Sequence, residues 1–435
     1  MNWTSWVTFS GFTFTETTTG DNMQRDGYEG YGSQQPMPGK DYCGEAVRMR
    51  GTAHCNVSNN HFLNVGGNAV YMEDYNERST ISGNEIAYPG KNGICILGSH
   101  YETGMEPTLI RHPLFCHIED NHIHHIGVFD NYASGIIVGI GQGNVIGHNL
   151  VEYTPHMAIC FGNSGYGRNI FKYNKIKNAC LEICDTGAIV GWMEDPAHHA
   201  RKDAERSGHV IRYNWIAGAP GCKVEQDGRL TSDPHSVQGI YLDNMTSNCF
   251  VYGNIINDAG TAIWVNMGKN NVIENNIIVN CKWAVWFQAF HTCFPQMYGF
   301  ATGNRFCTNI YCRLTPSNIP LPERTDTPMY GLRDIKGDEP IERLVSQIDN
   351  NLLYDDSGND WKVEIAIGKR KSVIRSLNEW QESGFDTHSK IADPQFTDPE
   401  KSNFHLMPQS PALELGFQPI PIDQIGIRHN SGPLD

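Results

Sequence analysis

The tripeptide Asn-x-(Ile/Val/Phe) recurs along most of this chain and restricts its fold more than any other feature. It begins at Asn60, Asn84, Asn121, Asn149, Asn174, Asn214, Asn254, Asn276 and Asn304. The spacings are 24, 37, 28, 25, 40, 40, 22 and 28 residues, and self-similarity at such periods is typical of solenoids. The shortest unit has no room for a crossover helix, and the units are rich in Val and Ile, which favour strands.

A second element follows each of the first eight Asn motifs: a small residue and then a β-branched one. The pairs are Ala69-Val70, Gly93-Ile94, Gly135-Ile136, Ala158-Ile159, Ala188-Ile189, Gly239-Ile240, Ala262-Ile263 and Ala284-Val285. Each unit therefore contains two or three short strands separated by turns, with the repeated Asn at a tight turn where its side chain can bond the backbone of its own or the next coil. We predict an all-β fold, a right-handed parallel β-helix of the pectate-lyase type. A leucine-rich repeat would need a Leu ladder, and a β-propeller would need longer and more even units.

The uneven spacings indicate insertions into a single solenoid. We expect residues 1–312 to form the β-helix, with inserted loops near 98–116, 192–208 and 217–237, and residues 313–435 to add coils or a covering segment to the same domain. Insertions in a solenoid collect on one side, so three of them in one stretch indicate a functional face.

Strands alternate faces with period two, so the small/β-branched pairs show which side chains should point outward. The residues two positions after the small one include Tyr241, Trp264 and Trp286, and those four positions after it include Trp192, Asp243, Asn266 and Gln288. Aromatic rings beside carboxylate and amide groups suit a sugar chain, whose CH faces stack on rings while its hydroxyls meet polar groups. The alternative is that the chain after Tyr311 covers this strip as ordinary core.

Composition excludes several functions. A net charge of −15 argues against a nucleic-acid partner, and a mean hydropathy of −0.43 without a long apolar run argues against a membrane span. Thirteen cysteines without zinc-type spacing favour buried thiols, no metal and a reducing compartment. The first six residues carry no signal-peptide pattern, so we expect a cytoplasmic protein as the chain stands, or a secreted or periplasmic one if its N-terminus is truncated. No cofactor motif is present.

Several segments resemble a known family. They are Cys184-Asp185-Thr186-Gly187-Ala188-Ile189, Gly239-Ile240-Tyr241-Leu242-Asp243-Asn244, Ala392-Asp393-Pro394-Gln395-Phe396, Ser410-Pro411-Ala412-Leu413-Glu414-Leu415-Gly416-Phe417 and Ile425-Gly426. Together they resemble glycoside hydrolase family 141, which contains α-L-fucosidases and xylanases acting on plant polysaccharides. The resemblance runs from about Val7 to Gly426 and implies an oligosaccharide or polysaccharide substrate. Members of that family carry a further region before the first coil, whereas this chain begins almost inside its first coil.

Glycoside hydrolysis needs two carboxyl groups, and the resemblance points to Asp185 and Asp243. They belong to consecutive coils, but in straight strands their positions would be roughly 20 Å apart at about 3.3 Å per residue. A glycosidase pair is separated by roughly 5–10 Å. Either the chain bends around Asp185, or a loop carboxylate substitutes for one of the two. The substitutes are Glu225, Asp227, Glu194 and Asp195.

Other residues and activities stay open at this point. His156 and His291 could assist catalysis. A polysaccharide lyase needs a base, often Lys or Arg, and commonly Ca²⁺, and the two outward rows aligned over eight coils contain neither Lys nor Arg. A non-catalytic carbohydrate-binding solenoid, such as an adhesin or phage tail, would keep the aromatic strip without a close carboxylate pair.

Overall fold

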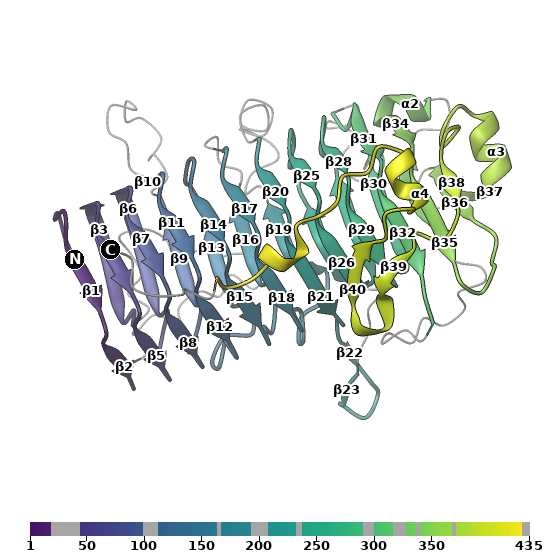
Figure 1. Cartoon of the computed structure of the whole chain (residues 1–435). Coiled ribbons are helices and arrows are strands. Elements are labelled where there is room, and N and C mark those ends of the chain that lie inside the picture. The colour runs from purple at the N-terminus through teal and green to yellow at the C-terminus, as the bar shows by residue number, and fades with distance from the viewer. Residues whose placement is uncertain are drawn as a thin grey trace.

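The computed structural model shows an elongated stack of short strands that begins at the N-terminus and continues to β36–β38 (residues 362–391), from where the last segment of the chain returns along the stack (Figure 1). It describes residues 1–18, 44–98, 112–162, 167–192, 208–231, 237–289, 300–315, 328–335, 340–367 and 371–428. The chain passes in turn through three long sheets, which we call sheets B, C and A, and then starts the next coil.

Sheet B has 11 strands. They are β1 (Thr8–Ser10), β4 (Asn56–Ser58), β7 (Thr80–Ser82), β11 (His117–Glu119), β14 (Val145–Gly147), β17 (Ile170–Lys172), β20 (Val210–Arg212), β25 (Phe250–Tyr252), β28 (Val272–Glu274), β31 (Asn304–Cys307) and β34 (Val345–Asp349).

Sheet C has 12 strands. They are β2 (Thr13–Thr15), β5 (His61–Leu63), β8 (Glu85–Ala87), β12 (His122–His124), β15 (Leu150–Glu152), β18 (Lys175–Lys177), β21 (Trp215–Ala219), β26 (Ile255–Ala259), β29 (Ile277–Val279), β32 (Ile310–Arg313), β35 (Leu352–Asp355) and β38 (Lys390–Ile391).

Sheet A has 13 strands. They are β3 (Val47–Ala53), β10 (Pro113–Leu114), β6 (Val70–Glu77), β9 (Ile94–Leu97), β13 (Ile136–Val138), β16 (Ile159–Gly162), β19 (Thr186–Trp192), β24 (Val237–Leu242), β27 (Thr261–Asn266), β30 (Trp283–Gln288), β33 (Tyr330–Ile335), β36 (Lys362–Ile367) and β37 (Lys371–Ser376).

Strands of successive coils pair in parallel, which confirms the predicted Ile/Val ladder. The ladder in sheet A runs through Ile94, Ile136, Ile159, Ile189, Ile240, Ile263 and Val285. Inward side chains of all three sheets form one continuous apolar core. Where the residue before the ladder position is glycine, crowding requires it: a Cβ on Gly239 would meet the Ile256 side chain and the Ala262 carbonyl oxygen.

The repeated Asn lies at the turn between sheets B and C, and its buried side chain links three coils. Asn174 donates from Nδ2 to Asn214 Oδ1 at 2.9 Å and to the Ile146 carbonyl at 2.9 Å, while its Oδ1 accepts from the backbone and side chain of Asn149. The same pattern connects Asn60, Asn84, Asn121, Asn149, Asn174, Asn214, Asn254, Asn276, Asn309 and Asn351. The predicted role of this Asn in turns is therefore confirmed.

The assignment of Asn304 to the predicted repeat is wrong. Asn276 bonds to Asn309, not to Asn304. Asn304 instead accepts from Asn271 at 3.1 Å in a second column, which lies at the turn from sheet A to sheet B. The sequence could not separate the two because both Asn residues precede an apolar residue by one or two positions.

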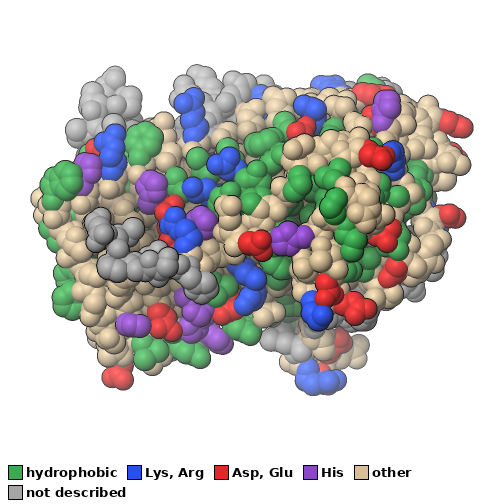
Figure 2. Space-filling view, viewed as in Figure 1, with side chains coloured by type: hydrophobic (Ala, Val, Ile, Leu, Met, Phe, Trp, Pro, Cys, Tyr) green, Lys and Arg blue, Asp and Glu red, His purple; other side chains and the backbone are tan. Residues whose placement is uncertain are grey.

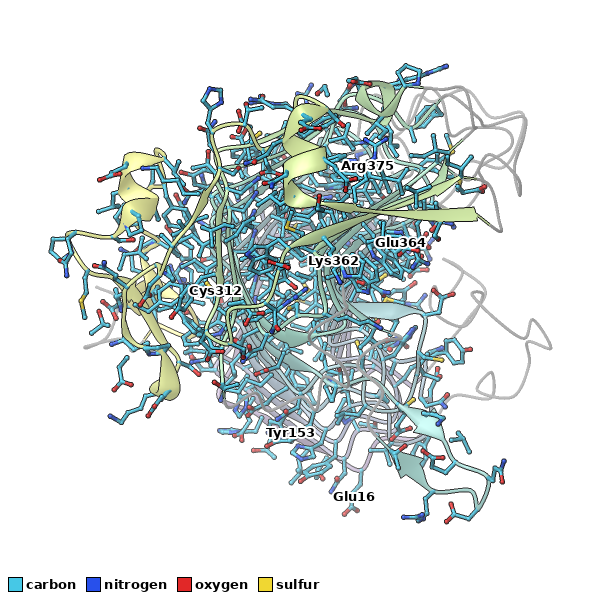
Figure 3. The ribbon with its side chains drawn as sticks, turned by 90° about the vertical axis from the view of Figure 1, so that its right-hand side faces the viewer. Glu16, Tyr153, Cys312, Lys362, Glu364 and Arg375 are labelled. Carbon is cyan, nitrogen blue, oxygen red and sulfur yellow. The ribbon has the colours of Figure 1, made fainter. Side chains whose placement is uncertain are left out.

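The end of the solenoid is closed by local elements, seen end-on in Figure 3, where Lys362 and Glu364 lie on β36. β36 and β37 form an antiparallel hairpin, and helix α3 (Leu377–Glu382) follows it with a capping box between Ser376 and Glu379. The α3 residue Trp380 is fully buried and stacks on Phe385. The remaining elements of this end are α2 (Ile341–Leu344), β39 (Phe396–Asp398), η6 (Pro399–Lys401), β40 (Asn403–Leu406), α4 (Pro411–Glu414) and η7 (Ile422–Gln424).

The last segment of the chain runs back across the outside of sheet C, as the yellow ribbon of Figure 1 shows. Its apolar side chains, among them Phe404 and Phe417, pack with Ile277 and Ile310 of that sheet. The segment is held farther along by a hydrogen bond from the Gly426 amide to the Tyr173 carbonyl. Within the described residues, this last segment therefore covers sheet C and not the aromatic strip of sheet A.

Three smaller points complete the fold. The predicted insertion at 217–237 contains the antiparallel hairpin of β22 (Lys223–Val224) and β23 (Leu230–Thr231). The described cysteines form no disulfide, and all of them except Cys184 are buried. Among the described residues, no helix is long and apolar enough to cross a membrane.

We predict that Asn174→Ala lowers the free energy of unfolding by about 3–5 kcal/mol, because it leaves buried backbone and side-chain groups of neighbouring coils without partners. The matched control is Asn56→Ala, whose amide makes one exposed contact to Thr8 and which should cost less than about 1 kcal/mol. Urea unfolding monitored by circular dichroism measures both. Equal losses for the two variants would contradict a structural role for the Asn column.

Candidate active site

Three aromatic side chains form a continuous strip across neighbouring strands of sheet A. Tyr241, Trp264 and Trp286 occupy paired positions on β24, β27 and β30. The Tyr241 ring stacks on Trp264 with centroids 4.8 Å apart, and Trp264 meets Trp286 edge to face at 5.0 Å. The predicted strip therefore exists as a physical contact surface.

The next coil completes the strip in a way that the sequence alignment missed. Gly331 pairs with Trp286, and a Cβ at this position would collide with the Trp286 ring. Arg333, two residues on, places its guanidinium 3.7 Å from the centroid of the Trp286 ring and pairs with Glu364 at 3.4 Å. The strip thus ends in a positive charge.

The prediction that the outward rows of sheet A contain no Lys or Arg does not hold beyond the eight aligned coils. Arg333 pairs with Gln288 and so continues the outward row that was taken to lack Lys and Arg. At the other end of sheet A, Arg48 donates to the fully buried Glu73 at 2.5 Å. The alignment of small/β-branched pairs included neither of these two coils. In the coil of Arg333, Met329 takes the place of the small residue before β33. The coil of Arg48 precedes the first Asn motif. Aligning Ala46-Val47 with the other small/β-branched pairs would have found Arg48.

The outward row before Tyr241 is not exposed as predicted. Tyr71, Cys95, Ile137, Cys160 and Val190 are buried and form one apolar cluster that ends at Tyr241. Tyr241 itself is only 4% exposed, so its ring faces cannot serve as an open stacking platform. Trp264 and Trp286 are partly exposed.

The polar row beside the strip is organised around Asp243. Asn266 donates from Nδ2 to Asp243 Oδ1 at 2.6 Å and lies 3.4 Å from the Tyr241 hydroxyl. The backbone amide of Asp243 still bonds to the Gly191 carbonyl, which fixes this residue at the end of β24. Asn266, Gln288 and Arg333 follow in register on the next strands.

The pKa of Asp243 is unusually high for a carboxylic acid. Burial is the main reason that its pKa rises to about 6, and the negative charge of Asp185 adds to the rise. Hydrogen bonds from Asn266, the Asn244 amide and Tyr241 act in the opposite direction. At mildly acidic pH the side chain therefore carries a proton that it can donate.

Asp185 lies nearer to Asp243 than straight strands would allow. It precedes β19 in a left-handed conformation, with φ at 56°. Gly187 pairs with Gln238, yet a Cβ on Gly187 would lie 3.2 Å from the Cβ of Tyr241, three residues farther along β24. The chain bends sharply at this corner. Because of this bend, the roughly 20 Å expected for straight strands is an upper limit for the separation of Asp185 and Asp243, and the charge of Asp185 raises the pKa of both Asp243 and Tyr241.

The two carboxyl groups differ in their surroundings. Asp185 is exposed to solvent, although nearby protein atoms desolvate its carboxyl group enough to raise its pKa. Asp243 is half-buried and accepts hydrogen bonds from neighbouring side chains. The pKa is raised in both groups, and the deeper burial of Asp243 is the difference that can give the two carboxyl groups different roles.

Several polar atoms along the strip make no hydrogen bond within the part of the chain that the structure describes. They are Trp264 Nε1, Trp286 Nε1, Asn266 Oδ1 and Arg333 Nε. Buried donors and acceptors are normally paired, so these atoms indicate a polar ligand or ordered water at this surface.

The remaining predicted residues lie elsewhere. Asp227 is fully exposed on the hairpin β22–β23, which projects from the solenoid in Figure 1, and Arg229 lowers its pKa through an ion pair at 2.6 Å. Glu225, on the same hairpin, accepts from Thr231. His156 is buried against Tyr132, and burial lowers its pKa to about 4. Glu194, Asp195, His291 and the Trp192 side chain lie outside the described residues.

Comparisons with known proteins bear on the fold. The family model described as "Right handed beta helix region" matches residues 45–195. The fold is an all-β right-handed parallel β-helix. A PL6 family alginate lyase covers 98% of this chain and 56% of its own at 11% identity, with a TM-score of 0.50. The predicted fold class is confirmed.

Two further solved structures are less similar. One titled "Glycoside hydrolase" is 16% identical over 54% of this chain and 38% of its own, with a TM-score of 0.45. The GH136 lacto-N-biosidase from Eubacterium ramulus is 10% identical over 83% and 53%, with a TM-score of 0.35. The chain spans about half the length, or less, of these structures. A comparison with curated proteins gave no match, and membership of glycoside hydrolase family 141 stays a prediction.

Because Asp243 is costly to ionise in the fold, we predict that Asp243→Asn stabilises the protein at pH 7. The pKa of this carboxyl is raised from 3.8 to about 6, so the free energy of unfolding of the wild type falls as pH rises through that interval. The loss reaches about 1–3 kcal/mol, and the variant, which has no carboxyl group to ionise, does not suffer it. Thermal unfolding at pH 4 and pH 7 should show the gain only at the higher pH. Asp227→Asn, which removes an exposed carboxylate of lowered pKa, should show no such gain.

Proposed function

We propose that this protein is a glycoside hydrolase whose catalytic pair is Asp243 and Asp185. The observation that carries the proposal is a half-buried carboxyl, Asp243, whose pKa is raised to about 6, beside a strip of tryptophans and on the strand next to the bend that carries a second carboxyl, Asp185. A carbohydrate-binding solenoid would need the strip but not the electrostatically coupled pair. A PL6 family alginate lyase has a similar fold, which is consistent with a carbohydrate substrate.

The environments assign the roles. Asp243, the more buried group, donates its proton to the glycosidic oxygen as the bond to the anomeric carbon breaks. Asp185, the more exposed group, acts on the anomeric carbon, either as the nucleophile or as the base that takes a proton from the attacking water. Asn266 and Tyr241 hold the Asp243 carboxyl in place, and His156, a neutral buried residue, takes no part in proton transfer.

The sugar binds along the strip. Trp264 and Trp286 supply ring faces or edges for its CH groups, and Asn266, Gln288 and Arg333 meet its hydroxyls. The resemblance to glycoside hydrolase family 141 makes α-L-fucosides and β-xylosides the first substrates to test.

A second candidate is a polysaccharide lyase, favoured by one observation. Arg333 lies in the polar row, where a guanidinium could neutralise the carboxylate of a uronate. Lyase cleavage leaves an unsaturated sugar that absorbs ultraviolet light, whereas hydrolysis leaves a new reducing end without that absorbance. Product analysis on alginate, pectate and neutral xylan separates the two chemistries directly.

We predict that Asp185→Asn and Asp243→Asn each lower kcat by about a thousand-fold or more while the fold stays intact. Asp227→Asn, the exposed control, should keep wild-type activity. Hydrolysis of aryl α-L-fucosides and β-xylosides measures the effect, and circular dichroism verifies folding. An active Asp243→Asn enzyme would overturn its role as acid.

The same assignment predicts the pH profile. Asp243 must be protonated to act, so kcat/KM should fall as pH rises through about 6, the pKa of that group. Asp185 must be ionised, so activity should also fall at low pH. A rate that instead rises through pH 6 would make Asp243 the base.

We predict that Trp264→Ala weakens oligosaccharide binding by about ten-fold, corresponding to the roughly 1–2 kcal/mol of a contact to an aromatic face. Trp6→Ala is the matched control, because Trp6 is 77% exposed on the first coil and stacks only on His54 among the described rings. Isothermal titration with the catalytically inactive Asp185→Asn protein measures affinity without turnover. Unchanged affinity for Trp264→Ala would place the binding surface elsewhere.

A further inference from the structure

A second cluster of chemically active side chains lies on the outward face of sheet C, away from the carboxylate pair of sheet A. His61, Glu85 and His122 occupy paired positions on β5, β8 and β12, and His124 pairs with Glu152 on β15. Figure 2 shows histidine and acidic side chains gathered on this part of the surface. The C-terminal segment packs on the later strands of the sheet.

Three of these side chains converge closely enough to share one ion. Ligand atoms of Glu85, His122 and His124 all lie within 4.8 Å of one another. His124 Nε2 faces Glu85 Oε1 at 3.9 Å, and the two histidine rings are 4.5 Å apart. Because His122 and His124 are two residues apart on a strand, they project from the same face. Zinc with bonds of about 2.0–2.2 Å needs donors about 3.4 Å apart, which small rotations of these partly exposed side chains can reach.

Each of the three candidate ligands also has a hydrogen-bond partner of the kind that accompanies metal ligands. His122 Nε2 lies 2.9 Å from Glu152 Oε1, and Glu85 Oε2 lies 2.9 Å from His61 Nδ1. When His122 donates from Nε2, its Nδ1 keeps the lone pair that a metal requires. Such outer partners fix the orientation and the protonation of metal ligands.

His124 has a comparable arrangement. Its Nδ1 lies 2.8 Å from Nδ1 of His125. When His124 is the donor of this hydrogen bond, its Nε2 keeps a lone pair, and this atom faces Glu85. On β8 the position paired with His124 is Ala87, whose small side chain leaves the space above it to the imidazole.

The donor set selects the kind of ion. Two neutral imidazoles and one carboxylate suit Zn²⁺ and neighbouring transition metals, whereas Ca²⁺ and Mg²⁺ prefer sites made of oxygen. We propose that Glu85, His122 and His124 bind one Zn²⁺-type ion on the outside of sheet C. The ion joins β8 to β12, two strands of successive coils, and so acts as a clip on the solenoid. The proposal does not depend on the carbohydrate chemistry of sheet A.

The test is titration of the chelator-treated full chain with Zn²⁺ by calorimetry. We expect one equivalent to bind with a Kd of about 1 µM or tighter and to raise Tm, since an ion that binds only the folded state stabilises it. His122→Ala and His124→Ala should each weaken binding at least about a hundred-fold. His117→Ala is the matched control, because His117 is a strand histidine near Glu119 on sheet B, at 3.6 Å, and should bind Zn²⁺ as the wild type does.

Two further measurements test whether a loss of folding, or Zn²⁺ binding by a cysteine, could explain the result. Glu85→Gln preserves the shape of the side chain and should weaken binding without lowering Tm in the presence of EDTA. Substitution with Co²⁺ should give a spectrum without thiolate charge-transfer bands, which separates this site from the exposed Cys184. Wild-type Zn²⁺ binding equal to that of the His122→Ala/His124→Ala double variant, or thiolate bands in the Co²⁺ spectrum, would overturn the proposal.

Discussion

The buried column of asparagine side chains is the interaction on which the rest of the structure depends. Each amide donates to the next amide in the column and to a backbone carbonyl of the preceding coil, so a polar group in the interior is satisfied by its own repeat. Because unpaired buried amides are costly, the column fixes which residue of each coil lies above which. It ends at Asp386, whose carboxylate accepts from Asn351 and Trp380.

A fixed turn position makes the rest of each coil tolerant of change. Coils differ widely in length, yet the strands of sheets B and C keep their register through every insertion between β4 and β29. The insertions therefore add chain outside the stack without moving the ladder. This arrangement allows one corner, before β19, to bend away from the regular path and bring Asp185 toward Asp243 without loss of the core.

Alternation along the strands gives the solenoid chemically different outer faces. Sheet A exposes tryptophans and polar groups over part of its length, whereas its earlier coils bury their outward residues in an apolar cluster. Sheet C carries histidine and glutamate on its early coils and apolar residues beneath the C-terminal segment on its later ones. The same inward ladder supports all of these surfaces, since outward residues do not contribute to it.

The sequence by itself determined the fold class, the inward ladder and the aromatic strip, because these depend on local periodicity and on side-chain size at crowded corners. It did not distinguish Asn304 from Asn309, since two asparagine columns with similar motifs differ only in their place along the coil. It missed Arg333, because Met329 interrupts the pattern that defined the alignment. The bend beside Asp185 and the burial of Tyr241 were decided by tertiary structure alone, because a bend in a strand and the cover over an outward face leave no periodic trace in the chain.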